Sequence, residues 1–333
     1  MSSLPATMRA IDPASPGGPD VLVVVERPVP QPGPGEVLIR VHAAGVNRPD
    51  ILQRMGLYPM PPGAPTIMGL EVAGEIVALG EGVATLSVGD PVCALIAGGG
   101  YADYATAPAV QCLPVPPGMR FDEAATLPET WFTVWANLND LAGARVGETM
   151  LVHGGTSGIG VTAIDFARSR DMQIIVTCGT DAKCQAAKAL GATHALNYRD
   201  GDFAPKVREL TGGRGVDIVL DMVGGEYFPR NLASLRDGGR HVSIAFQKGN
   251  RLELDVGFLM RKRLHVTGSM LRPRSVAEKG AIAEALEREI WPLFTDGRLK
   301  AHLFRSYPLE QADDAHRLME SGGHVGKIAL TLA

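Results

Sequence analysis

The chain has 333 residues, of which 45% are hydrophobic and 20% are charged, enough for two domains that each bury a core. Its 32 Lys and Arg residues against 36 Asp and Glu residues give a formal net charge of -4, without the basic excess of a dedicated nucleic-acid-binding protein. No apolar run approaches the ~20 residues of a membrane span, and from Met1 to Pro5 we expect no secretory signal. The four cysteines form no C-x-x-C pair, so we expect a cytoplasmic protein without a disulfide scaffold or a zinc ribbon.

The first 125 residues or so predict short strands separated by turns. Strand-like runs occur at Val21–Glu26, Glu36–Val41 and Val72–Leu79, and Pro- and Gly-rich segments such as 28–35 separate them. This spacing is typical of a small all-β, barrel-like domain.

From about Val146, strands and helices alternate, which predicts a parallel sheet with helices on both faces. The expected strands are Met150–His153, Gln173–Cys178, Ala195–Asn197, Val216–Asp221, His241–Ala245 and Leu264–Ser269. The expected helices are Gly158–Arg170, Ala182–Leu190, Phe203–Thr211 and Tyr227–Leu235.

The last segment predicts one long amphipathic helix, Val276–Phe294, and short strands that end at Lys327–Leu332. Because its short predicted strands resemble those of the first region, we expect the chain to return to the first domain. The predicted segments are therefore 1–128, 129–270 and 271–333.

A glycine-rich turn follows the first strand of the alternating region. Gly158, Gly160 and Ala163 form G-x-G-x-x-A at the start of a helix. Gly158 would permit the tight turn, Gly160 would let the backbone approach a pyrophosphate, and Ala163 would allow close helix–strand packing. The N–H groups of Ser157, Gly158, Ile159 and Gly160, with the helix dipole, would then bind phosphate. The turn predicts a dinucleotide site rather than a purely structural loop.

The end of the second strand indicates which dinucleotide is bound. A carboxylate there would bind the ribose 2′-hydroxyl, but this chain has Gly179 and Thr180. Gly179 leaves room for a 2′-phosphate, Thr180 offers a donor, Lys183 supplies charge, and Tyr198 could reach the same phosphate. We therefore predict NADPH. The alternative is that Lys183 lies on a solvated helix face and that Asp181 is an N-cap.

Further motifs run along the chain in order. They are Gly45–Asp50, Gln53–Tyr58, Met68–Gly74, Val88–Asp90, Ala124–Glu129, His153–Gly160, Asn197–Tyr198, Asp221–Gly225 and Gly326–Ile328. With them the chain resembles the zinc-free quinone oxidoreductases of the medium-chain dehydrogenase/reductase superfamily, and most of all their p53-inducible branch. The resemblance implies a GroES-like catalytic domain, a Rossmann domain, and NADPH-dependent reduction of quinones or similar conjugated carbonyls.

The resemblance also implies that no metal takes part. Zinc-dependent members of the superfamily place Cys where Asn47 stands, and His where Leu70 stands. Neither Asn nor Leu is a usual zinc ligand.

Candidate catalytic residues are Tyr58, Asn47 and Gln53, as donors to the acceptor oxygen, and Thr133. Tyr58 and Asn47 match positions near the substrate cleft of the family, and Thr133 resembles a threonine near the nicotinamide. As alternatives, Tyr58 packs a loop, Asn47 bonds a local turn, and Thr133 is an ordinary helix residue. We expect His153 to be a strand residue and not a base.

Three later strand ends complete the predicted cofactor site, because ligands bind at the carboxyl edge in this architecture. Val223 and Gly224, then Ala245, Phe246 and Gln247, are expected to line the riboses. Met270 and Leu271 are expected to reach the nicotinamide.

We predict an NADPH:quinone oxidoreductase with direct hydride transfer in a cleft between its domains. Two alternatives are a 2-enoyl thioester or enone reductase, and an NADPH-bound binding or structural protein with little turnover. We expect a small-molecule quinone or enone substrate and neither a nucleic-acid nor a membrane partner. Leu264–Ser269 would be an edge strand that pairs with its copy in a homodimer.

Overall fold

The structure is a computed structural model that describes residues 4–58 and 60–332. Met1–Ser3, on which the prediction about the N-terminus partly depends, lie outside the described residues, as do Pro59 and Ala333. The chain divides into unit 1, which comprises Met1–Phe132 and Arg272–Ala333, and unit 2, which comprises Thr133–Leu271. The domain bounds predicted from the sequence stay a prediction. Within the described part of the chain, no helix is long and apolar enough to cross a membrane.

Unit 1 is built on a largely antiparallel sheet. Its strands run in the order β14-β15-β3-β4-β5-β7, and β6 pairs with β3. Their bounds are β3 (Glu36–Val46), β4 (Glu71–Leu79), β5 (Pro91–Leu95), β6 (Tyr104–Pro108), β7 (Cys112–Pro114), β14 (Leu303–Pro308) and β15 (Lys327–Thr331). A separate ribbon pairs β1 (Thr7–Ile11) with β2 (Val24–Pro28).

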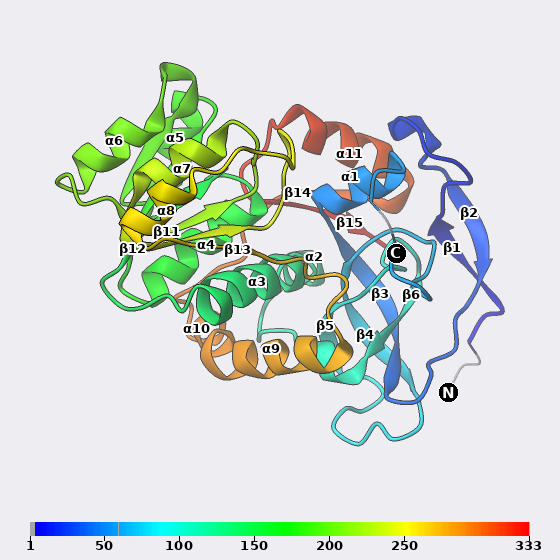
Figure 1. The fold of residues 1–333 in the computed structure, drawn as a ribbon. Coiled ribbons are helices and arrows are strands. Elements are labelled where there is room, and N and C mark those ends of the chain that lie inside the picture. The colour runs from blue at the N-terminus through cyan, green and yellow to red at the C-terminus, as the bar shows by residue number, and fades with distance from the viewer. Residues whose placement is uncertain (1–3, 59, 333) are drawn as a thin grey trace. The chain divides into compact units, whose positions relative to one another are not determined.

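The C-terminal strands extend the N-terminal sheet, as the red and blue ribbons of Figure 1 show. Ile328 of β15 lies opposite Val46 of β3, antiparallel. The two strands contribute to one buried core, in which Val37, Ile39 and Leu330 have no solvent exposure.

The helices of unit 1 are α1 (Arg48–Arg54), α2 (Phe121–Ala124), α9 (Val276–Glu289), α10 (Trp291–Thr295) and α11 (Ala312–Ser321), and α3 (Pro128–Val134) leads into unit 2. The prediction of a single helix over Val276–Phe294 is wrong. Pro292 lies in the first turn of α10, and a proline there has no N–H and clashes with the preceding turn, so the helix is broken after α9.

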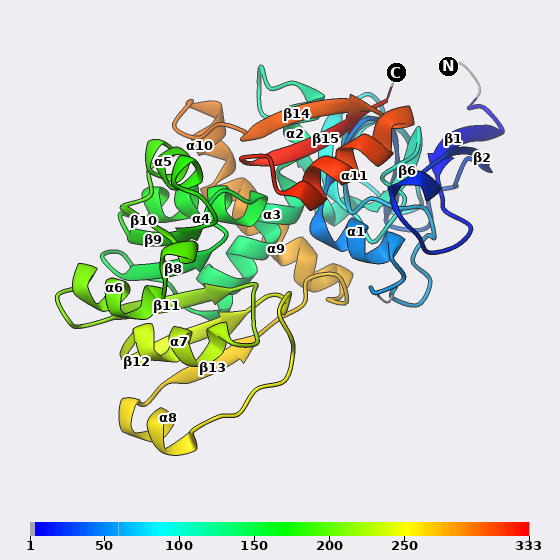
Figure 2. The same ribbon diagram turned by 90° about the horizontal axis from the view of Figure 1, so that it is seen from above.

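Unit 2 is a six-stranded parallel sheet in the order β10-β9-β8-β11-β12-β13, which Figure 2 shows in sequence. The strands are β8 (Thr149–His153), β9 (Gln173–Cys178), β10 (His194–Asn197), β11 (Val216–Asp221), β12 (Leu235–Ser243) and β13 (His265–Gly268). In chain order this is 3-2-1-4-5-6, the doubly wound order of dinucleotide-binding sheets.

Helices connect these strands. They are α4 (Gly158–Ser169), α5 (Asp181–Ala189), α6 (Phe203–Leu210), α7 (Tyr227–Ser234) and α8 (Val256–Lys262). One sheet face, with Leu151, Ile175 and Val219, packs against α6 and α7. The sequence did not predict α8, and its N-cap Asp255 accepts a hydrogen bond from the Phe258 N–H at 2.9 Å.

Candidate functional site

The predicted cofactor residues of unit 2 all follow the carboxyl ends of its strands, which share one edge of a parallel sheet. Ser157, Gly158, Ile159 and Gly160 follow β8; Gly179, Thr180 and Lys183 follow β9; Tyr198 follows β10; Val223 and Gly224 follow β11; Ala245, Phe246 and Gln247 follow β12; Met270 and Leu271 follow β13. The structure thus brings them to one edge. Their contact with a cofactor stays a prediction.

The turn between β8 and α4 differs in detail from the sequence interpretation. The left-handed residue is Gly154, with φ of +69°, whereas Gly158 is the first residue of α4. A Cβ atom on Gly160 would lie 2.2 Å from the carbonyl oxygen of Gly154. Gly154 therefore makes the tight turn that was assigned to Gly158, and Gly160 packs directly against it.

Two of the four N–H groups predicted to bind phosphate are used inside the turn. The Ser157 N–H donates to the Gly154 carbonyl at 2.8 Å, and the Gly160 N–H donates to Ser157 Oγ at 3.1 Å. Gly158 and Ile159 begin α4, where N–H groups have no partner within the helix. Phosphate binding at this turn would depend on these two groups and on the helix dipole.

The end of β9 has a small residue where a ribose-binding acid would stand. A Cβ on Gly179 would lie 2.6 Å from the hydroxyl of Tyr198, so these two predicted residues are in contact. Thr180, and not Asp181, is the N-cap of α5, and its side chain accepts from the Lys183 N–H at 3.2 Å. Asp181 Oδ1 instead accepts from Asn197 Nδ2 at 2.9 Å.

The loops that follow β11 and β12 hold each other in place. Asp221 Oδ1 accepts from the N–H groups of Val223 at 2.7 Å and Gly224 at 3.1 Å. The Lys248 N–H donates to the Val223 carbonyl at 2.7 Å. Phe246 is 58% exposed, so the second loop presents an apolar ring to solvent at this edge.

His153 is buried in the sheet as predicted. Its Nδ1 lies 2.9 Å from Thr177 Oγ1, and its Nε2 lies 2.7 Å from Asn231 Oδ1. Burial lowers the pKa of His153 below its ordinary value. The ring is therefore neutral, with both nitrogens engaged, which does not suit a catalytic base.

Thr133 belongs to unit 2, at the end of α3. Its carbonyl accepts from Asn137 Nδ2 at 2.8 Å, and Asn137 Oδ1 accepts from Ser269 Oγ at 2.8 Å. This chain of contacts links Thr133 to the segment that carries Met270.

In unit 1, Asn47 lies in a buried polar cluster rather than bonding only a local turn. Asn47 Nδ2 donates to Glu71 Oε1 at 2.8 Å, and Lys327 Nζ donates to Asn47 Oδ1. The Lys327 ammonium also lies 2.8 Å from Glu71 Oε1. Sequence reasoning missed Glu71 and Lys327, although a glutamate within the apolar strand β4 was a signal of a buried partner.

Asp50 adjoins this cluster. Its Oδ2 accepts from the Asn47 N–H at 2.8 Å and from the Tyr101 hydroxyl at 3.2 Å, while its Oδ1 is buried without a partner. Burial raises the pKa of Asp50 to about 7. The carboxyl is therefore partly protonated near neutral pH.

Tyr58 is half-buried, and the guanidinium carbon of Arg272 lies 5.3 Å from its ring centroid. Burial, reinforced by the nearby Glu129 carboxyl, raises the pKa of Tyr58 to about 12, so its hydroxyl stays protonated. Gln53 makes a different contact, with its Nε2 donating to the Thr66 carbonyl at 3.2 Å. Arg272 was not singled out from the sequence.

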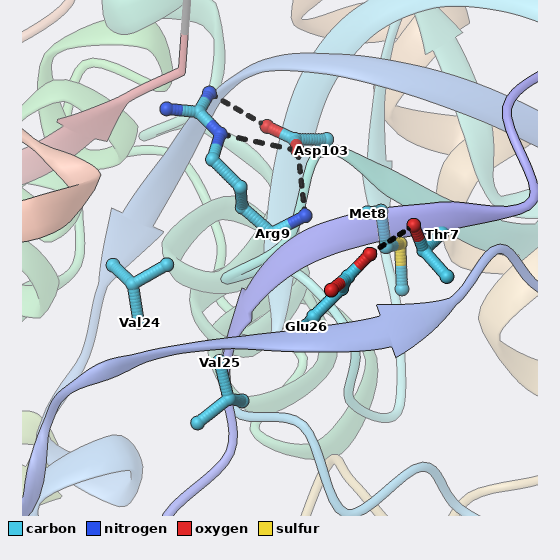
Figure 3. Close-up of a pocket in the computed structure, with 7 residues that line it drawn as sticks. All are labelled: Thr7, Met8, Arg9, Val24, Val25, Glu26 and Asp103. Carbon is cyan, nitrogen blue, oxygen red and sulfur yellow. Dashed lines mark hydrogen bonds and ion pairs between the residues drawn. The ribbon is translucent and has the colours of Figure 1, made fainter.

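A shallow pocket elsewhere in unit 1 is lined by none of the predicted site residues (Figure 3). Figure 3 shows Arg9 directed toward Asp103, 2.8 Å away, and Thr7 hydrogen-bonded to Glu26. Arg9 also pairs with Glu310 at 2.8 Å. Since its charged groups are paired, the pocket shows no feature of a catalytic centre.

Over residues 4–58 and 60–332, no group of three or more His, Cys, Asp or Glu side chains could hold a metal ion. Asn47 and Leu70 stand where zinc-dependent members of the superfamily carry Cys and His. Asn47 is hydrogen-bonded to Glu71 and Lys327, and Leu70 is buried.

Two family models match the chain. Residues 33–117 match the alcohol dehydrogenase GroES-like domain, and residues 190–330 match the zinc-binding dehydrogenase family. A quinone oxidoreductase from Rattus norvegicus is 32% identical over 328 residues, with 98% of each chain covered. A mycocerosic acid synthase-like polyketide synthase from Mycobacterium tuberculosis is 34% identical over 302 residues, but the chain covers only 14% of that protein.

Solved structures of quinone oxidoreductases and enoyl reductases are also similar to this chain. The Escherichia coli quinone oxidoreductase complexed with NADPH has a TM-score of 0.87 and 31% identity, over 98% of this chain and 100% of that one. The CurK enoyl reductase has a TM-score of 0.85 and 29% identity, over 99% and 100%. Together the comparisons confirm the predicted fold, in which a GroES-like β-barrel domain is combined with a Rossmann sheet.

Proposed function

Because the chain belongs to the quinone oxidoreductase family of the medium-chain dehydrogenases/reductases, we propose that it is an NADPH-dependent reductase of quinones or related conjugated carbonyls. The observation that carries the proposal is the carboxyl edge of unit 2, where Gly179, Tyr198 and Lys183 stand in place of a ribose-binding acid. A relative named quinone oxidoreductase over 98% of the chain supports the acceptor class.

The residues at this edge fit NADPH. Gly158 and Ile159 offer N–H groups at the start of α4. Gly160 lets the turn pack closely at this point, because a Cβ atom there would clash with the Gly154 carbonyl oxygen. Thr180 keeps its hydroxyl proton free to donate while its oxygen caps α5. Lys183 supplies a positive charge one turn into that helix. When bound, NADPH supplies the hydride.

The chain's own task is then to hold the acceptor and to stabilise charge on its oxygen, since hydride transfer needs alignment more than acid–base chemistry. Tyr58 is the proposed donor, because its hydroxyl stays protonated at neutral pH. Asn47 is proposed to shape the site through its bonds to Glu71 and Lys327. Gln53 and Thr133 stay predictions, as does transfer between the two domains.

We further propose that the reaction is independent of zinc. The Lys327 ammonium, 2.8 Å from Glu71 Oε1, already supplies a cation to the carboxylate beside Asn47, and a second cation there would be repelled. Dialysis against a strong chelator should leave turnover unchanged, and elemental analysis should find less than one zinc per chain. Tightly bound stoichiometric zinc would contradict this proposal.

A second candidate is a 2-enoyl thioester or enone reductase. It is favoured by the similarity of the chain to the CurK enoyl reductase and to a segment of polyketide synthases. The same donor, Tyr58, would serve a conjugated thioester. An NADPH-bound protein with little turnover is the third candidate.

One assay separates these candidates. NADPH oxidation is followed at fixed protein concentration against quinones, simple enones and 2-enoyl thioesters, each also with NADH. The proposal expects the highest kcat/KM for quinones or enones with NADPH. Preference for thioesters would support the second candidate, and turnover of none of the acceptors would support the third.

The cytoplasmic location and the absence of nucleic-acid and membrane partners stay predictions. We also propose a homodimer that pairs β13 with its copy. Support comes from the position of β13 at the edge of the sheet, where Val266 is exposed.

A further inference from the structure

Arg272 is a buried cation of unit 1 that has one donor unused. The residue is 7% exposed. Its Nε and Nη2 donate to the carbonyl oxygen of Ala97 at 3.0 and 2.6 Å. Its Nη1 is shielded from solvent and has no partner among the described residues. Buried donors are normally paired, so an unpaired one in a native fold calls for a ligand or another functional reason.

A second buried cation lies beside it. Lys279 is 6% exposed and donates through Nζ to the Arg272 carbonyl at 2.8 Å. Burial lowers the pKa of both Arg272 and Lys279, while the nearby Glu129 carboxyl acts in the opposite direction on each. The pKa of Glu129 is itself raised to about 8, chiefly by burial, so near pH 7 it is mostly neutral. Two buried cationic side chains, Arg272 and Lys279, thus lie near each other, an arrangement that suits an anionic oxygen.

Tyr58 covers this guanidinium. Its ring centroid lies 5.3 Å from the guanidinium carbon, within the range of a cation–π contact. The segment around it is open to solvent, since Met55, Leu57 and Met60 are exposed. A ligand oxygen that lies beside the Tyr58 ring could accept a hydrogen bond from Nη1.

We propose that Arg272 Nη1 donates to the acceptor oxygen on which negative charge develops, which makes Arg272 a second catalytic donor beside Tyr58. The inference rests on the proposed function and assigns a donor to the carbonyl oxygen of the same acceptors, in which the reduced carbon is conjugated with that carbonyl.

The chemistry balances as follows. A hydride adds two electrons to an electrophilic carbon of the acceptor, and NADPH becomes NADP⁺. The π electrons of the acceptor move to its conjugated carbonyl oxygen, which becomes an anion, and a proton from water then gives the saturated carbonyl compound. With a quinone, the reduced ring carbon afterwards loses a proton to water and the second carbonyl oxygen gains one, which completes the hydroquinone. Arg272 keeps its proton throughout and stabilises the anion electrostatically.

The test compares R272M, R272K and R272Q with wild type. R272M should lower kcat for quinone and enone reduction by about 100-fold or more, as expected for loss of a donor to an oxyanion. R272K, which keeps the charge, should recover part of that loss, and R272Q, which can still donate to Ala97, should not. The KM for NADPH should be unchanged in all three, because the proposed cofactor residues lie in unit 2. The control is R305M: Arg305 is exposed in unit 1 and lies 5.9 Å from the ring of Tyr307.

A binding measurement makes the test independent of turnover. The protein without cofactor is titrated with 4-nitrophenolate, an anionic phenol that resembles a reduced acceptor, and its absorbance is followed. Wild type and R305M should bind the phenolate, and R272M and R272Q should not. Unchanged kcat in R272M, or phenolate binding that does not depend on Arg272, would overturn the inference. If wild type reduces no acceptor, the proposed function fails, and the phenolate titration alone decides about Arg272.

Discussion

Removing the Lys327 ammonium should destabilise unit 1 strongly. Lys327 and Glu71 lie 2.8 Å apart, with side-chain exposures of 5% and 0%. Lys327→Met would leave the Glu71 carboxylate buried without its cation, and Asn47 Oδ1 and the Val46 carbonyl would each lose a donor. Breaking one side of a buried ion pair costs about 3–5 kcal/mol. In a unit of this size, that cost corresponds to a fall in Tm on the order of 10 °C.

Guanidinium unfolding, followed by tryptophan fluorescence, measures this loss. The matched control is Lys248→Met, because Lys248 lies 2.9 Å from Glu226 but both side chains are more than half exposed. An exposed pair contributes only about 0–1 kcal/mol. The double variant Glu71→Gln, Lys327→Met removes both charges and should be more stable than Lys327→Met alone. A loss below about 1 kcal/mol in Lys327→Met would refute the assignment of a buried ion pair.

Three further predictions concern other parts of the chain. Lys183→Glu should raise the KM for NADPH about 10- to 100-fold, with little effect on the KM for NADH, because a charge-assisted contact to the 2′-phosphate is worth about 1.5–3 kcal/mol. Lys188→Glu on the same helix is the control. Equal affinity of the wild type for both cofactors would contradict the prediction. Asp50 binds its proton more tightly in the folded protein, with a pKa of about 7 against an ordinary value of 3.8, so its ionisation destabilises the fold as pH rises through this window. The unfolding free energy of Asp50→Asn should therefore rise relative to wild type by about 1.4 kcal/mol per pH unit between pH 4 and 7, and a pH-independent difference would count against a buried, partly protonated carboxyl. Light scattering of wild type should give twice the chain mass of 35.2 kDa, and Val266→Pro should give a monomer or aggregate; a wild-type monomer at micromolar concentration would rule out the dimer.

The alternating strands and helices were predictable because their signals are local. The bounds of β9 and β11 agree with the sequence prediction, since each is a short apolar run that ends in a turn. Pro292 was also a signal in the sequence that the helix breaks, but the apolar spacing on both sides of it led to the prediction of one helix instead of two. The Gly154 turn was misassigned because the motif was aligned on Gly158, one turn further along.

The buried contacts of unit 1 could not be predicted in the same way. Glu71 and Lys327 lie far apart in the sequence, and the pairing of β3 with both β4 and β15 brings them together. Arg272 offered no local signal either, because it follows the last strand of unit 2 as an ordinary loop residue. Its unused donor becomes visible only when the burial of its side chain and its contact with Ala97 are known.

The polar contacts through the sheet of unit 2 have a consequence for how the sequence can evolve. Neutral His153 must take its Nδ1 hydrogen bond from the Thr177 hydroxyl and give its Nε2 proton to Asn231, while His241 Nε2 lies 3.2 Å from Asp221. Asn231 Nδ2 lies 3.4 Å from His241 Nε2, so the two histidines meet at one amide. Replacing one of these five side chains leaves a buried neighbour unsatisfied, whereas an apolar exchange of several at once does not. In related chains we therefore expect these positions to covary, and an ancestral intermediate between two such sets to be less stable than either.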